Sequence, residues 1–162
     1  MMGAKTASTA PTHPGSHMPS TQFTVHTTLT PSEVITVLTD FGPDRASRWP
    51  NIDEAHFKVH EVGADYAEVT EGTSAGWERE LYSWDAAAGI VTIETLDSNL
   101  WGPGSGWHYQ LTPADGGTDV RVKLTRVPKS IVGRVLGLLI PLVGGQTLGK
   151  QLKSVFRKAE SG

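Results

Sequence analysis

Residues 131–145 read "IVGRVLGLLIPLVGG", the most apolar run in the chain, and they decide how the rest of the sequence is interpreted. Apolar residues recur in this run at helical spacing, and the same spacing continues through Leu152, Val155 and Phe156. Pro141 lacks a backbone N–H and should kink or break the helix between the two halves. The pattern predicts a long C-terminal helix with an interruption near its middle.

The length of the apolar run argues against a transmembrane helix. A spanning helix needs about 20 predominantly apolar residues. The charge-free run here, residues 135–149, contains Pro141 and four glycines, and its strongly apolar part ends at Val143. An amphipathic helix that covers a sheet is the better interpretation. Leu138 and Leu142 lie off the main stripe, so the helix needs apolar contacts on more than one side, or an additional apolar object such as a ligand.

The chain before this helix shows the alternation typical of β-strands. Residues 22–29, "QFTVHTTL", place Phe23, Val25, Thr27 and Leu29 on one face of a first strand. Six more candidates follow at a spacing near ten residues, joined by short links rich in glycine and aspartate, which indicates antiparallel hairpins. These candidates are residues 55–63, 65–73, 76–85, 89–96, 104–113 and 118–127.

Two short helices are predicted between the first and second strands. Thr30 is a good N-cap, Pro31 fits the first helical position, and Glu33 completes a capping box. The segment "DRASRWP", residues 44–50, adds a second helical turn before the Trp-Pro pair forces the chain into an extended conformation.

This order of elements resembles that of the START-related helix-grip superfamily, which includes birch-pollen-allergen-like proteins and polyketide cyclase/dehydrase proteins. The resemblance is carried by "TPSEVITVLTDF" (30–41), "GWERELYSWDAAAGIVTIET" (76–95) and "GWHYQLTPADGGTDVRVKLTR" (106–126). It implies an α+β fold in which a curved seven-stranded antiparallel sheet wraps around a long C-terminal helix, with two short helices after the first strand. It also implies that residues 22–160 form a single domain with a hollow for hydrophobic small molecules.

Composition excludes several classes of site. The chain has no cysteine, which excludes disulfides, zinc–thiolate centres and thiol nucleophiles, and its net charge of −3 offers no footprint for nucleic acid. Residues 1–21 are rich in Ser, Thr, Pro, Gly and Ala, and predict a disordered tail. Within it, "GSHM" (15–18) is typical of a cleaved expression tag. No apolar segment follows Lys5 as in a secretory signal, so we expect a cytoplasmic protein.

Charge is distributed unevenly along the chain. Residues 129–162 contain six bases and one acid, whereas residues 1–128 contain 8 bases and 16 acids. The basic C-terminal segment predicts either a solvated helix face or a transient contact with an anionic membrane. The sequence is compatible with a monomer or a homodimer.

Aromatic residues point to a ligand cavity. Five tryptophans is a high number for 162 residues, and most of them lie in or beside predicted strands, where flat rings form the walls of small-molecule pockets. In the strand 76–85 we expect the face with Trp77, Arg79 and Leu81 to point inward. The predicted ligand-binding residues are Trp49, Trp77, Leu81, Trp101, Trp107, Tyr109, Leu136, Leu139 and Ile140.

Few residues suggest catalysis. Glu71 and Asp97 are the candidates for a general base, and Arg79 for an oxyanion partner. Arg79 and Glu71 alternatively form a structural ion pair between neighbouring strands. His56 and His60 fall on one predicted strand about 13 Å apart, too far to share a metal ion. No pattern predicts a metal site or a cofactor.

Two classes of function follow. The first is a carrier or sensor that binds a lipid, polyketide or isoprenoid-like molecule in an internal cavity. The alternative is a polyketide cyclase or dehydratase that orients a reactive chain in the same cavity and moves protons. In a third interpretation, the protein is a peripheral lipid shuttle whose basic C-terminal helix rests on anionic lipid.

Overall fold

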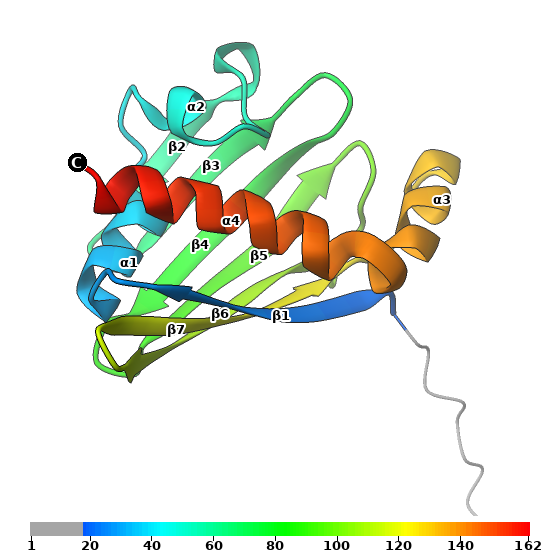
Figure 1. Ribbon diagram of the computed structural model, residues 1–162. Helices are drawn as coiled ribbons and strands as arrows, with labels where there is room; N and C mark the ends of the chain where they lie inside the picture. The colour runs from blue at the N-terminus through cyan, green and yellow to red at the C-terminus, as the bar shows by residue number, and fades with distance from the viewer. Residues whose placement is uncertain (1–17) are drawn as a thin grey trace, which may run out of the picture.

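The structure, a computed structural model, describes residues 18–162 and contains one seven-stranded antiparallel sheet (Figure 1). The strand order is β1-β7-β6-β5-β4-β3-β2, so the first and last strands in sequence lie side by side. The strands are β1 (Ser20–Thr27), β2 (Lys58–Val62), β3 (Tyr66–Gly72), β4 (Trp77–Asp85), β5 (Ile90–Ser98), β6 (Gly106–Ala114) and β7 (Gly117–Thr125). β1 begins at Ser20, two residues before the predicted domain start, and residues 1–17 of the predicted tail lie outside the described residues.

Short links explain why each strand from β2 to β7 pairs with the next. Asp115 and Gly116 alone join β6 to β7, and Gly116 has a positive φ of 74°. Gly89, at the start of β5, has a φ of 67°. Glycine adopts this left-handed conformation without a steric penalty, and tight turns depend on it. The predicted antiparallel hairpins are confirmed.

The two short helices after β1 are also confirmed. They are α1 (Pro31–Thr39) and α2 (Arg45–Arg48). The capping box at α1 is complete, because the Thr30 hydroxyl accepts from the Glu33 N–H and Glu33 Oε2 accepts from the Thr30 N–H at 2.7 Å. The prediction that His56 lies on the second strand was wrong. His56 ends the 3₁₀ turn η1 (Glu54–His56), where the Asp53 carboxylate accepts its backbone N–H at 2.9 Å.

The long C-terminal helix consists of α3 (Ile131–Leu139), the π-helical turn η2 (Ile140–Gly144) and α4 (Gly145–Glu160). Pro141 lies in η2, and its missing N–H accounts for the break in the α-helical hydrogen-bond pattern. α4 lies across the concave face of the sheet, whereas α3 turns away from it (Figure 1). Leu152, Val155 and Phe156 are the buried residues of α4.

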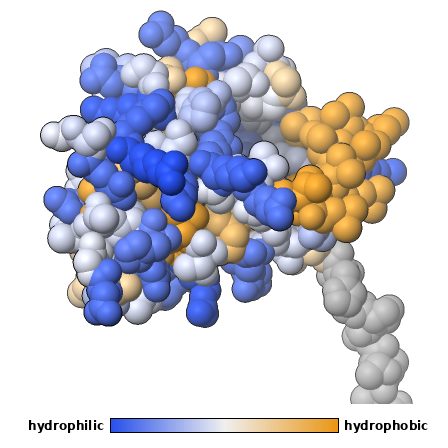
Figure 2. Space-filling model, in the orientation of Figure 1, coloured by the Kyte–Doolittle hydropathy of each residue, from blue (hydrophilic) through white to orange (hydrophobic). Residues whose placement is uncertain are grey.

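The burial of α3 is the reverse of what its sequence predicts. Its buried residues are Gly133 and Gly137, and its large apolar side chains face solvent (Figure 2). Gly133 lies so close to the Leu100 carbonyl that a Cβ there would be 2.4 Å from the oxygen. The missing side chains allow this close approach, and the helix is therefore held by its glycine face.

By length and composition alone, the helical segment Ile131–Glu160 could cross a membrane. Its second half nevertheless belongs to the core, because α4 is buried along one side and Glu160 at its end accepts a hydrogen bond from the Thr27 hydroxyl at 2.6 Å.

Substitutions in the two halves of the C-terminal helix should have very different effects. Phe156 is 1% exposed, so Phe156→Ala should lower the free energy of unfolding by about 3–5 kcal/mol, because it removes apolar contacts and leaves a cavity. Leu138 is 74% exposed, and Leu138→Ala should change the free energy of unfolding by less than about 0.5 kcal/mol. Urea denaturation of both variants measures the difference. Equal effects would contradict this division of the helix.

Candidate functional site

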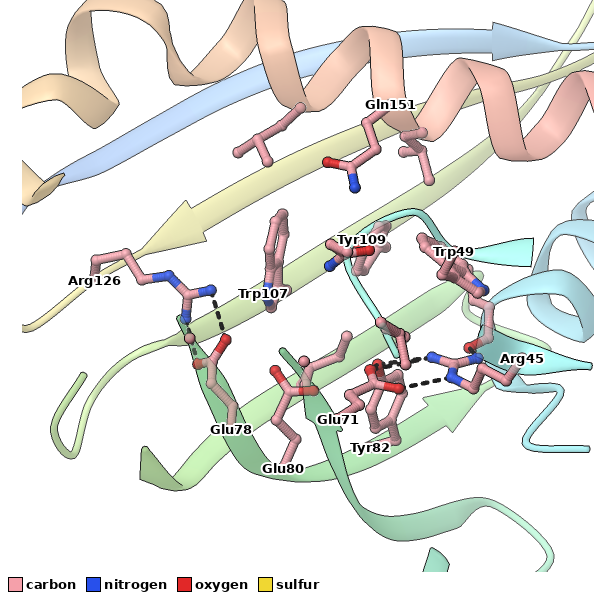
Figure 3. A pocket seen from close by; sticks show the side chains of 18 of the residues that line it. Arg45, Trp49, Glu71, Glu78, Glu80, Tyr82, Trp107, Tyr109, Arg126 and Gln151 are labelled. Carbon is pink, nitrogen blue, oxygen red and sulfur yellow. Dashed lines mark hydrogen bonds and ion pairs between the residues drawn. The ribbon is translucent and has the colours of Figure 1, made fainter. Parts of the chain in front are cut away.

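A cavity of about 120 Å³ lies between the concave face of the sheet and α4 (Figure 3). Its polar lining consists of Arg45, Asn51, Glu71, Glu78, Glu80, Arg126 and Gln151. Its apolar and aromatic lining consists of Phe23, Leu38, Trp49, Ile52, Tyr82, Ile93, Trp107, Tyr109, Leu148 and Leu152. The cavity therefore joins flat rings to an unusually large number of charged groups.

One end of the cavity is formed by a buried ion pair between Arg45 of α2 and Glu71 of β3. Arg45 Nε donates to Glu71 Oε2 at 2.7 Å, and Nη2 donates to Glu71 Oε1 at 3.2 Å. Nη1 donates to the carbonyls of Leu38 and Asp40, and Nη2 also donates to the Tyr82 hydroxyl. All five guanidinium N–H groups are thus used, which lets a charged side chain remain 2% exposed.

Aromatic rings cover this ion pair. The guanidinium carbon of Arg45 lies 4.6 Å from the Phe41 ring centroid and 5.3 Å from that of Trp49. The hydroxyl of Tyr82 donates to Glu71 Oε1. Burial and the negative charge of Glu71 raise the pKa of Tyr82 well above 10, so this phenol keeps its proton at neutral pH.

The opposite end of the cavity contains a second ion pair. Arg126, just after β7, donates to both carboxylate oxygens of Glu78 on β4, at 2.7 and 2.9 Å. The Thr95 hydroxyl donates to the same carboxylate at 2.9 Å. The guanidinium carbon of Arg126 lies 5.2 Å from the Trp101 ring and 5.3 Å from the Trp107 ring. The geometry is the bidentate arrangement that holds a carboxylate and an arginine most firmly.

Glu80 is the third carboxyl group, and it lies between the other two (Figure 3). It is 3% exposed and lines the cavity, but among residues 18–162 no arginine, lysine or histidine forms an ion pair with it. Burial raises its pKa well above 4.5, and the negative charges of Glu78 and Glu71 raise it further against the opposing effect of Arg126. Glu80 is therefore a neutral acid over a range in which ordinary glutamates are ionised.

The cavity wall next to Glu80 is aromatic, and its cover is partly polar. Trp107 and Tyr109 of β6 stack with their ring centroids 6.2 Å apart. Burial raises the pKa of Tyr109, and the negative charge of Glu71 adds to this effect, so Tyr109 remains a neutral phenol. From α4, the Gln151 amide points into the cavity (Figure 3). The site can therefore hold a flat molecule, donate hydrogen bonds to it and exchange a proton with it.

Solved structures of several proteins share this fold. The Zhui aromatase/cyclase from a Streptomyces species has a TM-score of 0.71 at 17% identity, covering 89% of this chain and 94% of that chain. A Thermus thermophilus protein has a TM-score of 0.71 at 13% identity, covering 88% and 98%. A START superfamily protein from Mycobacterium smegmatis has a TM-score of 0.62 at 13% identity, covering 89% and 99%. The fold is that of the START-related helix-grip proteins.

Sequence comparison adds no closer relationship, because neither a protein-family model nor a curated protein matches this chain. At these low identities, the helix-grip neighbours establish the fold alone. The chemistry of the cavity must therefore be argued from its own residues.

The predicted orientation of β4 was wrong. Trp77, Arg79 and Leu81 were expected to face the interior, but Glu78, Glu80 and Tyr82 do so. The prediction assigned the more apolar face to the core. In this helix-grip sheet the charged face is tolerated inside, because arginines from distant elements neutralise two of the carboxylates.

The structure brings four of the predicted site residues to the cavity: Trp49, Glu71, Trp107 and Tyr109. Trp77 and Leu81 lie on the other face of β4, and Trp101 lies behind Arg126. Leu136, Leu139 and Ile140 belong to the projecting α3 and η2, outside the lining. Whether these residues contact a ligand stays a prediction.

The other catalytic candidates do not reach the cavity. Arg79 pairs with Glu68 on the outer face of the sheet, and the predicted ion pair between Arg79 and Glu71 is not formed, because Glu71 faces the cavity and pairs with Arg45. Asp97 is exposed and pairs with Lys129 at 3.0 Å, which lowers the pKa of its carboxyl. Sequence reasoning missed Arg45, Arg126, Glu78 and Glu80. The alternation of Glu78, Glu80 and Tyr82 on one face of a strand was the available signal.

The raised pKa of Glu80 predicts a pH-dependent penalty to stability. As pH rises above 4.5, the unfolded chain releases the Glu80 proton while the folded chain keeps it, so the free energy of unfolding falls until the folded-state pKa is passed. Glu80→Gln removes this effect. The variant should match the native protein near about pH 4 and become more stable than it towards about pH 8.

Urea denaturation of both proteins across this pH range measures the effect. Glu94→Gln on the neighbouring strand β5 is the control, because the Glu94 side chain is exposed and lies outside the cavity. If Glu80→Gln gave no stability gain that grows with pH, Glu80 would not be a buried neutral acid.

Proposed function

We propose that the cavity binds a small polyketide-like or other ring-bearing molecule and that Glu80 catalyses proton transfer on it, as in a cyclase or dehydratase. The proposal depends on one observation: a carboxyl group that is 3% exposed, faces a cavity and has no cationic partner in the described part of the chain. Enzymes raise the pKa of a carboxyl in this way to obtain an acid that works near neutral pH.

The size and lining of the cavity favour a compact ligand. Its volume of about 120 Å³ is close to that of an engineered cavity of about 150 Å³ that admits benzene. A long acyl chain would also leave the two ion pairs and Glu80 against methylene groups, which cannot hydrogen-bond to them. Trp107 offers a flat surface to a ring.

A dehydration step balances with Glu80 as the only proton-transfer group. Neutral Glu80 donates its proton to the hydroxyl oxygen of a β-hydroxy ketone, and the C–O bond breaks to release water. In the same step the other Glu80 oxygen takes a proton from the carbon next to the ketone, and the electron pair of that C–H bond forms the new C=C bond as the C–O bond breaks. Glu80 is neutral again at the end of the step. Tyr109 and Gln151 supply hydrogen-bond donors that can orient the ketone.

The second candidate function is binding without reaction, as a carrier or sensor. One specific observation favours it. Arg45 and Arg126 are both engaged by carboxylates, and all five donors of Arg45 are used. Arg45 is therefore not free to stabilise an oxyanion, and the charge of Arg126 is already paired with Glu78, whereas many enzymes that act on carbonyl groups require a free donor.

Ligand binding can be measured by calorimetric titration with a monocyclic aromatic phenol and with a long-chain fatty acid. The phenol should bind more tightly. Trp107→Ala should weaken its binding at least about tenfold, since the stacking surface is lost. Trp77→Ala, on the opposite face of the sheet, is the matched control and should bind normally. Tighter binding of the fatty acid would contradict the proposed ligand class.

Catalysis can be tested with a panel of ring-bearing β-hydroxy ketones, following water loss by mass spectrometry. Glu80→Gln should lower kcat by about 10²- to 10⁴-fold while leaving ligand affinity nearly intact. Glu94→Gln should retain full turnover. Saturable binding without turnover of any compound would favour the carrier, and an unchanged kcat in Glu80→Gln would remove Glu80 from the mechanism.

A further inference from the structure

We propose that α3 and η2 form an interfacial anchor that docks the protein on the surface of an anionic membrane. The anchor surface is the set of large apolar side chains that these two elements expose. It consists of Ile131, Val132, Val135, Leu136, Leu138, Leu139, Leu142 and Val143.

The exposure of this surface is extreme for side chains of its kind. Ile131, Leu138 and Leu142 are 79%, 74% and 77% exposed. The eight side chains gather at one end of the molecule, in the largest hydrophobic area seen in Figure 2. Contiguous apolar patches of this kind mark surfaces that contact another molecule or a membrane.

The residues of the anchor surface all lie on one side of the helix. At about 100° per residue, its eight members fall within an arc of about 160°, as in an amphipathic helix. Gly133 and Gly137 lie on the other side, where Gly137 approaches Pro19 and Pro128 and Gly133 approaches Leu100. The body of the protein thus holds the helix by its smallest residues and directs its apolar arc outward.

The chain offers little to cover this surface. The described residues leave it exposed, and residues 1–17 contain only two large apolar residues, Met1 and Met2. The occupant is therefore expected outside residues 1–162.

The charges around the anchor surface indicate that its partner is an anionic membrane. Residues 120–159 contain nine bases and no acid, although Arg126 pairs with Glu78 and Lys129 with Asp97. Lys129 precedes α3, and Arg134 lies at the edge of the apolar arc. Lys150, Lys153 and Arg157 form an exposed row along α4. Anionic lipid is attracted by each such base near its surface, whereas two copies that met through their anchor surfaces would bring like charges together.

The anchor surface is too short to cross a bilayer. Residues 131–143 would measure about 20 Å as a helix, against about 30 Å of hydrocarbon. The rest of the helix cannot extend this length while the protein is folded, because α4 is packed on the sheet through Leu152, Val155 and Phe156. An apolar arc bordered by bases is instead typical of helices that lie in the membrane interface.

Docking in this way would bring the cavity close to lipid. Leu148 and Gln151, within two turns of η2, line the cavity from α4. Figure 2 shows a recess in the surface beside the hydrophobic area. A sparingly soluble ligand could then pass between bilayer and cavity. The membrane proposal does not depend on which reaction, if any, occurs in the cavity.

The test is co-sedimentation of the full chain with phosphatidylcholine vesicles that contain or lack phosphatidylserine. Binding should require phosphatidylserine and weaken as salt is added. The double substitution Leu138→Ser and Leu142→Ser should reduce vesicle binding at least about tenfold, because two apolar side chains no longer enter the interface. Val59→Ser with Val62→Ser is the matched control, since it removes two exposed apolar side chains from the edge strand β2.

Three results would overturn the proposal. One is the absence of sedimentation with phosphatidylserine vesicles. Another is equal loss of binding in the two double variants. The third is release from vesicles by detergent alone and never by high salt, which would indicate a spanning segment.

Light scattering tests the alternative that the anchor surface joins two copies of the chain. A dimer that is lost on substitution of Leu138 and Leu142, together with no binding to vesicles, would show that this surface is an interface between copies. Unchanged phenol binding in the Leu138/Leu142 variant shows that fold and cavity are intact, so the membrane and cavity proposals can fail separately.

Discussion

The need to neutralise charge inside the domain shapes this structure. Arg45 is buried only because five acceptors from α1, its C-terminal end, β3 and β4 surround its guanidinium. This network connects the short helices α1 and α2 to strands β3 and β4, and it forms one end of the cavity. Removal of either Arg45 or Glu71 would leave an unpaired buried charge, which costs far more than the pair contributes. The polar network thus fixes where the aromatic rings of Phe41, Trp49 and Tyr82 can lie.

The same constraint explains why Glu80 is distinctive. Within residues 18–162, three carboxyl groups face the cavity, but only two arginines do so. The charge of each arginine is neutralised by one glutamate, and the third carboxyl avoids the penalty for a buried charge by keeping its proton. A neutral acid in a small aromatic chamber then follows from the charge balance of the cavity. The chemistry proposed for the site uses this single unmatched group.

The C-terminal helix divides its apolar residues between two tasks. α4 is gripped by the sheet through three buried side chains, and the Thr27 hydroxyl holds its last turn through Glu160. Beyond the proline-containing turn η2, α3 keeps contact with the body through glycines and turns its large side chains outward. In water alone, the domain gains nothing from exposing these side chains. The arrangement becomes favourable when a basic, apolar surface meets an anionic interface.

The sequence by itself determined the elements and their order. Turn glycines, the capping box at Thr30 and Glu33, and the alternation of β-strand residues act between near neighbours, and they predict seven antiparallel strands, two short helices and an interrupted final helix. The tertiary structure alone decided which face of β4 points inward and which side of α3 is buried. Arg45 and Glu71 are 26 residues apart, and Arg126 and Glu78 are 48 apart. Such partners are not visible in a local sequence pattern. The hydrophobicity pattern therefore predicted, wrongly, that the charged face of β4 points to solvent. Likewise, the large residues of α3 were assigned to the core, because close packing between glycines and a neighbouring backbone depends on where that backbone passes.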